Sequence, residues 1–103
     1  MAGQSWSINV VPSDGGISLN PDVWGVDAGA PLQAEVGDLV SWNNQTDGDS
    51  QIVVSGETLD AKAWQSTTAH EIQNPNNIPT PYSITYTCSS VSGDQSGQID
   101  VLS

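Results

Sequence analysis

The sequence predicts an all-β domain, an antiparallel sandwich of two sheets built from seven or eight short strands. Apolar and polar residues alternate over several short segments, as in strands that are buried on one face. Clusters of Gly, Pro, Asn, Asp and Ser separate these segments, and no stretch has a sustained helical period. Because 103 residues are enough for one hydrophobic core but not for two, we expect a single domain over residues 1–103.

The first half of the chain contains several segments with this alternation. The strands expected there cover residues 6–10, 17–19 with a continuation at 23–26, 32–36, and 39–42. Turn residues separate them at 12–16, 20–22 and 27–31, and Gly37-Asp38 predicts a tight corner. These turns favour short antiparallel strands.

The second half is less regular. Adjacent apolar residues at 52–54 predict a strand covered on both faces. Residues 59–64 fit either a short helix or an irregular strand, whereas the prolines in 74–81 predict a loop. Alternation returns at 82–89 and 98–101, which predicts two final strands.

Two stretches of the sequence carry motifs with a family resemblance. The segment Val36-Gly37-Asp38-Leu39-Val40-Ser41-Trp42-Asn43-Asn44 resembles the pattern Gly-Asp-x-Val-x-Trp-x-Asn of the cupredoxins, the blue-copper family. Tyr86 and Cys88 begin a segment that resembles the late cupredoxin copper loop, and Gly97, Ile99 and Val101 resemble its closing strand. The resemblance covers about residues 31–54 and 81–102, and it implies a Greek-key sandwich of the cupredoxin type.

The resemblance also implies where copper ligands should lie. A blue-copper site needs two imidazoles and a thiolate, with a weak axial ligand. The first His position falls at Ser50, or at Gln51 if the register shifts by one, and the second falls near Val91. Cys88 occupies the thiolate position and Gln95 the axial one, so both imidazoles are missing. We therefore expect no metal and no cofactor, with a non-standard copper site on Cys88 and Gln95 as the alternative.

Other residues offer weaker candidate sites. The single His70, beside Glu71, completes no metal motif and is interpreted as a surface or hydrogen-bonded histidine, although it is also a conceivable extra copper ligand. The polar tract 43–50 is rich in oxygen ligands for Ca²⁺, but it does not fit the helix-loop-helix calcium pattern, and we interpret it as a hydrophilic connection between strands.

The four tryptophans suggest two roles. Trp6 and Trp42 lie in alternating segments and are expected in the core. Trp24 and Trp64, if exposed, are able to stack on sugar rings, which makes a carbohydrate-binding sandwich a third hypothesis.

Charge excludes some classes of partner. Twelve acidic residues face one Lys and no Arg, giving a net charge of −11. Such a surface repels nucleic acid and anionic membranes. The composition is compatible with simple solubility, with adaptation to high salt as in halophilic proteins, or with a basic partner. No apolar run approaches the roughly 20 residues of a membrane helix, and residues 1–5 do not resemble a signal peptide.

The sequence therefore favours a binding or structural module rather than an enzyme. One cysteine cannot form an internal disulfide, and no catalytic motif is present. We expect a monomer with a protein or glycan partner, in an extracellular, periplasmic or cell-surface protein. The loops at the former copper end are expected to face that partner.

Overall fold

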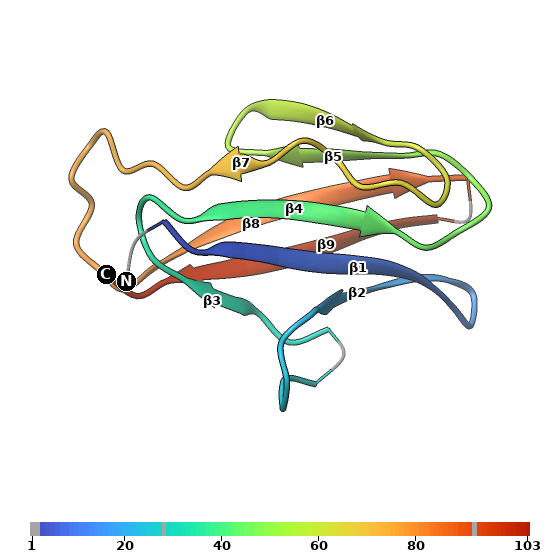
Figure 1. The fold of residues 1–103 in the computed structure, drawn as a ribbon, viewed down its shortest axis with the longest axis horizontal. Helices are drawn as coiled ribbons and strands as arrows, with labels where there is room; N and C mark the ends of the chain where they lie inside the picture. The colour runs from blue at the N-terminus through green and yellow to red at the C-terminus, as the bar shows by residue number, and fades with distance from the viewer. Residues whose placement is uncertain (1–2, 28, 92) are drawn as a thin grey trace.

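The fold is an all-β sandwich, as the sequence predicts. The computed structural model describes residues 3–27, 29–91 and 93–103, and these contain no α-helix. One sheet has the strand order β2-β1-β4-β7 and the other has the order β3-β9-β8-β5-β6 (Figure 1). The described residues form nine strands: β1 (Ser5–Ser13), β2 (Gly16–Pro21), β3 (Leu32–Ala34), β4 (Leu39–Asn44), β5 (Ser50–Val54), β6 (Glu57–Ala61), β7 (His70–Glu71), β8 (Tyr82–Ser90) and β9 (Gly93–Val101).

Two strand pairs are parallel, so the expectation of a wholly antiparallel sandwich is wrong in this detail. β1 pairs with β4, and β3 pairs with β9, in parallel register, while the other pairs are antiparallel. A tight turn joins only antiparallel neighbours, but β1 and β4 are separated by β2 and β3. The intervening chain leaves room for a parallel arrangement that local sequence patterns do not reveal.

Two local expectations also differ from the structure, at Val53 and at residues 23–26. Val53 is 42 % exposed, because β5 is covered on its inner face only, where Ile52 and Val54 lie. Of the two alternatives for residues 59–64, the strand is observed in part: β6 ends at Ala61 and a turn follows, without a helix. Residues 23–26 belong to an exposed loop and do not extend β2. The Pro-rich segment 74–81 is a loop, as expected.

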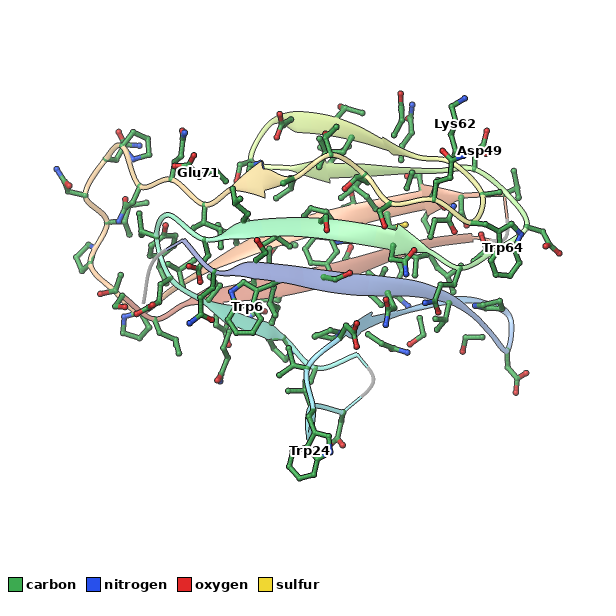
Figure 2. All side chains as sticks on the ribbon, viewed as in Figure 1. Trp6, Trp24, Asp49, Lys62, Trp64 and Glu71 are labelled. Carbon is green, nitrogen blue, oxygen red and sulfur yellow. The ribbon has the colours of Figure 1, made fainter. Side chains whose placement is uncertain are left out.

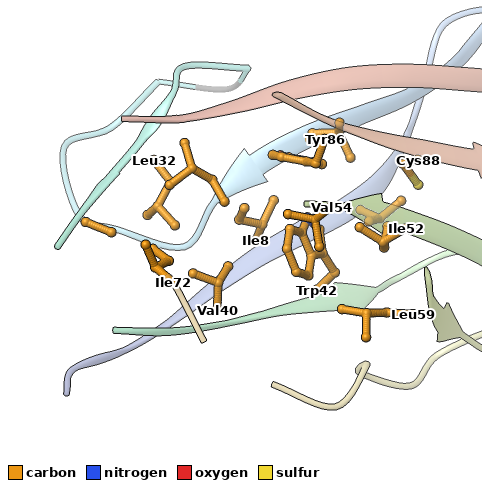
Figure 3. Close-up of a cluster of buried hydrophobic side chains, with 14 of the residues drawn as sticks. Ile8, Leu32, Val40, Trp42, Ile52, Val54, Leu59, Ile72, Tyr86 and Cys88 are labelled. Atoms are coloured by element: carbon orange, nitrogen blue, oxygen red, sulfur yellow. The ribbon is translucent and has the colours of Figure 1, made fainter. Parts of the chain in front are cut away.

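The core lies between the two sheets and is centred on Trp42 (Figure 3). Trp42 from β4 packs edge-on against Tyr86 from β8, with ring centroids 5.1 Å apart and an interplanar angle of 67°. Tyr86 lies over its strand partner Gly97, where a Cβ would collide with the ring. Of the two tryptophans expected in the core, Trp42 is fully buried and Trp6 is half-buried.

The corner before β4 is held by a buried carboxylate. Asp38 accepts hydrogen bonds from the Trp6 indole Nε1 at 2.8 Å and from the backbone N–H groups of Gln4 and Glu35, both at 3.0 Å. Burial of Asp38 opposes its ionisation, but these hydrogen bonds together hold its pKa below the ordinary value. Gly37 has a φ of 94°, a conformation that favours glycine.

A buried amide fixes the opposite end of β4. The Asn44 side chain donates to the carbonyls of Gly48 and Ala61, both at 2.8 Å, and its Oδ1 accepts from the Thr46 backbone N–H at 3.1 Å. The sequence Asn44-Gln45-Thr46 matches the acceptor motif for N-glycosylation, but Asn44 is fully buried and is therefore inaccessible in the folded protein. The amide instead sets the path of the β4–β5 connection.

No helix in the described part of the chain is long and apolar enough to cross a membrane.

Candidate functional site: the loop end

Four connections meet at one end of the sandwich, at the right of Figure 1, and we call this surface the loop end. It comprises the β1–β2 turn (residues 14–15), the β4–β5 connection (45–49), the turn after β6 (62–66) and Val91 in the β8–β9 turn. Val91 packs on the β4–β5 connection, since a Cβ at Gly48 would lie 2.5 Å from its Cγ2. Val91 is therefore in contact with the β4–β5 connection.

Three of the four copper-site positions, Ser50, Cys88 and Gln95, lie on the neighbouring strands β5, β8 and β9, and Val91 lies in the turn after β8. Only two of the four are buried together. Ile52 pairs with Cys88, Ser50 pairs with Ser90, and Cys88 pairs with Gln95. Ser50 and Cys88 are both buried in the sandwich.

The other two positions face solvent. Val91 is 85 % exposed, and Gln95 is exposed with its Oε1 accepting a hydrogen bond from the Ser96 backbone N–H at 3.1 Å. The backbone thus brings the positions near one another without forming a ligand set.

Cys88 is an unreactive thiol. Its exposed fraction is 0 %, and burial raises its pKa to about 11, while the Ser50 hydroxyl has a smaller opposing effect and the charge of Asp94 raises it slightly further. The Ser50 Oγ is near enough to influence the thiol but completes no hydrogen bond of ordinary geometry within the described residues. A thiol that stays protonated at neutral pH is a poor nucleophile and a poor metal ligand.

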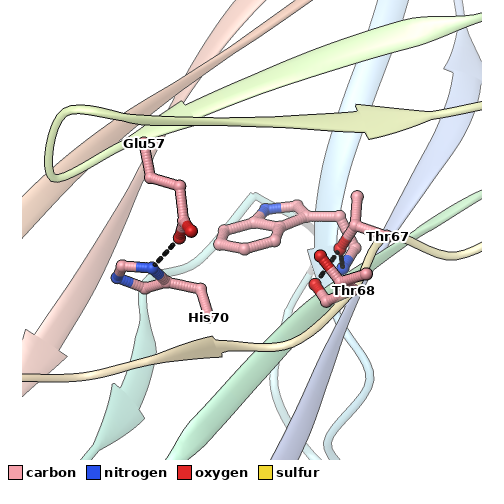
Figure 4. Close-up of polar contacts among 5 residues, drawn as sticks. Glu57, Thr67, Thr68 and His70 are labelled. Carbon is pink, nitrogen blue, oxygen red and sulfur yellow. Dashed lines mark hydrogen bonds and ion pairs between the residues drawn. The ribbon is translucent and has the colours of Figure 1, made fainter.

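His70 is engaged elsewhere (Figure 4). It pairs with Val40 in the sheet opposite Cys88, and its Nδ1 lies 2.6 Å from Glu57 Oε1. This contact joins β7 of one sheet to β6 of the other. Beside it, Thr67 Oγ1 accepts from the Trp42 backbone N–H at 3.1 Å and donates to the Thr68 carbonyl at 2.8 Å. The contacts of His70 are those of a hydrogen-bonded structural residue.

The acidic residues of the β4–β5 connection bind the turn after β6. Asp47 Oδ1 accepts a hydrogen bond from the Trp64 indole Nε1 at 3.2 Å, and Asp49 Oδ1 accepts from the Ala63 backbone N–H at 3.0 Å. Among the residues that the structure describes, no group of three or more His, Cys, Asp or Glu side chains is placed to hold a metal ion. Side-chain oxygens of the tract proposed for calcium thus accept hydrogen bonds from the protein itself, from both backbone and side-chain donors.

The backbone at Trp64 is strained, and its side chain is exposed. Its φ is 62°, a left-handed value that is unfavourable for a bulky side chain, and its side chain is 64 % exposed. Trp24 is 99 % exposed, but it lies at the tip of a different loop, away from Trp64 (Figure 2). The two exposed indoles therefore do not form one stacking platform.

A shallow cavity of about 490 Å³ borders the loop end on the outer face of β5, β6 and β8. Its lining includes Lys62, the single lysine of the sequence, together with Asp49, Asp60, Gln51 and Ser89. The mixture of one cation, two carboxylates and uncharged polar groups favours no single small ligand.

Sequence patterns did not reveal the strained display of Trp64 or the carboxylates that hold its turn. Trp64 was a candidate only because an exposed tryptophan is useful for binding, and its φ depends on the tertiary contacts of residues 47–49 with 63–64. The short spacing in Asp47-Gly48-Asp49 and Lys62-Ala63-Trp64 gives no signal that the two segments meet.

Searches of protein-family models and of curated proteins gave no match to this chain.

Proposed function

We propose that this chain is a cupredoxin-like β-sandwich that acts as a metal-free binding module, with the loop end as its binding face. The role is non-catalytic. Placement in an exported or cell-surface protein follows only from the cupredoxin resemblance.

The positions of the two similar stretches support the relationship to cupredoxins. The corner at Asp38 and the strand β4 lie in one sheet, while β8 and β9 lie in the other, and Trp42 meets Tyr86 across the core. Cys88 and Ser50 are buried on neighbouring strands, which is the arrangement that a site built between these segments requires.

The observation that carries the metal-free proposal is the residue beside the thiol. Ser50 occupies the buried position where an imidazole is needed, and its hydroxyl is not a ligand for copper in a blue-copper centre. Val91, at the second imidazole position, has no donor atom at all. Cys88 alone, protonated and inaccessible, leaves copper with one weak candidate ligand.

A copper titration tests this proposal. Adding Cu(II) to the protein at neutral pH should give no intense visible thiolate-to-copper absorption band, because a surface-bound ion lacks a sulfur ligand. The Cys88→Ser variant is the matched control and should give the same spectrum. An intense band in the unmodified protein that disappears in Cys88→Ser would instead establish the alternative, an electron-transfer site built on Cys88 and Gln95.

A carbohydrate-binding role is the second candidate, favoured by the exposure of Trp24 and Trp64. A glycan array separates it from protein binding. Specific glycan signals that are lost in Trp24→Ala or Trp64→Ala would support sugar stacking on that indole, and no signal above background would argue against it.

A further inference from the structure

We propose that the loop end binds a basic segment of a partner protein through an arginine side chain that stacks on Trp64 and pairs with Asp47. This inference rests on the proposed function, which makes the loop end the binding face, and it adds the chemistry of the partner.

The first argument is the fixed display of the indole. Trp64 is mostly exposed, yet its Nε1 is tied to Asp47 and the preceding residue, Ala63, is tied to Asp49. These contacts hold the ring in place, so little conformational freedom is lost when a ligand stacks on it. Exposed, well-held tryptophan is the residue most enriched among the anchors of protein interfaces.

The second argument is electrostatic. Asp47 and Asp49 each use Oδ1 for the Trp64 turn, and their Oδ2 atoms make no hydrogen bond within the described residues. Both side chains are exposed in a protein of net charge −11, so a cation is attracted to this surface and an anion is repelled. Lys62, the single basic side chain, lies near Asp49 (Figure 2) and leaves the local charge negative.

The third argument selects arginine among the possible cations. A guanidinium is planar, stacks on an indole face and still donates in its own plane to a carboxylate, whereas an ammonium does so less well. Val91 and Gly48, next to Asp47, supply an apolar surface for a neighbouring aliphatic stem. Together these groups fit an arginine-containing segment.

Titration with a defined peptide tests the proposal. The probe is a capped peptide of four Gly-Arg repeats, added to ¹⁵N-labelled protein at 0.15 M salt. The indole Nε1–H resonance of Trp64 should shift, and Trp64→Ala should weaken binding about fivefold, because an exposed cation–π contact contributes about 1 kcal/mol. Trp24→Ala removes an equally exposed indole elsewhere and should weaken binding less than about twofold.

Two variants with the same change in net charge distinguish a specific arginine–Asp47 pair from general attraction of the basic peptide to the acidic protein. Asp47→Asn and Asp27→Asn each remove one exposed carboxylate, but only Asp47 touches Trp64. Asp47→Asn should weaken binding of the arginine peptide about threefold more than Asp27→Asn does. Replacing arginine by lysine in the peptide should weaken binding about threefold.

Equal losses in Trp64→Ala and Trp24→Ala, or in the two Asp→Asn variants, would overturn the inference, as would binding of a neutral glycan without binding of the peptide. The ¹⁵N spectrum of Trp64→Ala should keep the resonance dispersion of the unmodified protein, which excludes a folding defect as the cause of its weaker binding. The peptide titration and the Cu(II) titration are independent measurements. A protein that does not bind the peptide can still lack the thiolate-to-copper band, so the failure of this inference is distinguishable from the failure of the proposed metal-free module.

Discussion

The corner at Asp38 and the loop end differ in how their polar groups are used. At the corner, all three donors around Asp38 are satisfied by its carboxylate, and the group is buried. Next to the loop end, the buried hydroxyl of Ser50, the first residue of β5, has no hydrogen-bond partner within the described residues. In the loop end itself, Trp64 adopts a strained backbone conformation with its side chain in solvent. The corner has the features of a stabilising element, and the loop end has those of a surface shaped for contact.

A similar difference exists between the first of the two stretches that resemble cupredoxins and the positions where the resemblance implies copper ligands. Within the first similar stretch, Asp38, Trp42 and Asn44 each make contacts that hold the sandwich together. The positions expected to bind copper make no comparable contacts with one another. The contacts of this stretch therefore concern the stability of the sandwich and not a metal site.

The largest expected effect is at the corner. Asp38→Ala leaves three donors without their acceptor, so it should lower the free energy of unfolding by about 3–5 kcal/mol in a urea titration. Asp60→Ala, which removes an exposed carboxylate, is the control and should change stability by less than about 0.5 kcal/mol. A loss below about 1 kcal/mol in Asp38→Ala would contradict the comparison.

The lowered pKa of Asp38 also predicts an acid dependence. Its contribution to stability is present above the ordinary carboxyl pKa and is lost as pH falls through the lower value in the folded protein. The Asp38→Ala variant should therefore lose less stability than the unmodified protein as the pH is lowered below about 4. Parallel urea titrations between pH 2 and 6 would measure this, and identical losses would contradict it.

The next effect is alkaline destabilisation from Cys88. Its thiol releases a proton near pH 9 in the unfolded chain but only near 11 in the folded protein, so the folded state holds the extra proton between these values. The contribution of this proton to the free energy of unfolding is fully present below pH 9, and about 2–3 kcal/mol of it should be lost by pH 11. The Cys88→Ala variant should lose less free energy of unfolding between pH 9 and 11, as measured by urea titration. Burial raises the pKa of Tyr86 to about 12, so both proteins should lose further stability above pH 10.

A smaller effect of opposite sign is expected at Trp64. Glycine adopts a left-handed φ without steric strain, so Trp64→Gly should raise the free energy of unfolding by about 1 kcal/mol. Trp24→Gly removes the other exposed indole without relieving a positive φ and should be neutral or slightly destabilising. Thermal unfolding of both variants measures the difference, and destabilisation by Trp64→Gly would show that the turn is not strained.

The smallest effect is expected at Ser50. Ser50→Ala removes a buried hydroxyl without a hydrogen-bond partner and should stabilise the protein by up to about 1 kcal/mol. Thr46→Val is the contrasting variant, because the Thr46 hydroxyl lies 2.7 Å from Asn44 Oδ1 and 3.0 Å from the Gly48 carbonyl, and its loss should cost about 1–2 kcal/mol. Equal effects in chemical denaturation would contradict the distinction between satisfied and unsatisfied hydroxyls.

The sequence predicted the strands whose inner and outer faces differ clearly. Alternation around Ile8, Trp42 and Tyr86 reflects one buried and one exposed face, and it places these side chains in the core correctly. It failed at Val53, because two adjacent valines fit either a strand covered on both faces or one that simply exposes an apolar residue. Alternation also places Cys88 on the face of Tyr86 and Ser50 on the face of Ile52, but their complete burial depends on the sheet that covers that face.

The sequence by itself determined the all-β class, most strand positions and the lack of histidines at the two expected ligand positions, because these depend on local alternation and residue identity. Only the tertiary structure decided the parallel pairs, the seclusion of Cys88 and the strained display of Trp64 beside Asp47. Each of these depends on segments far apart in the chain, and a local pattern carries no information about which distant segment will supply the hydrogen bond or the covering side chain.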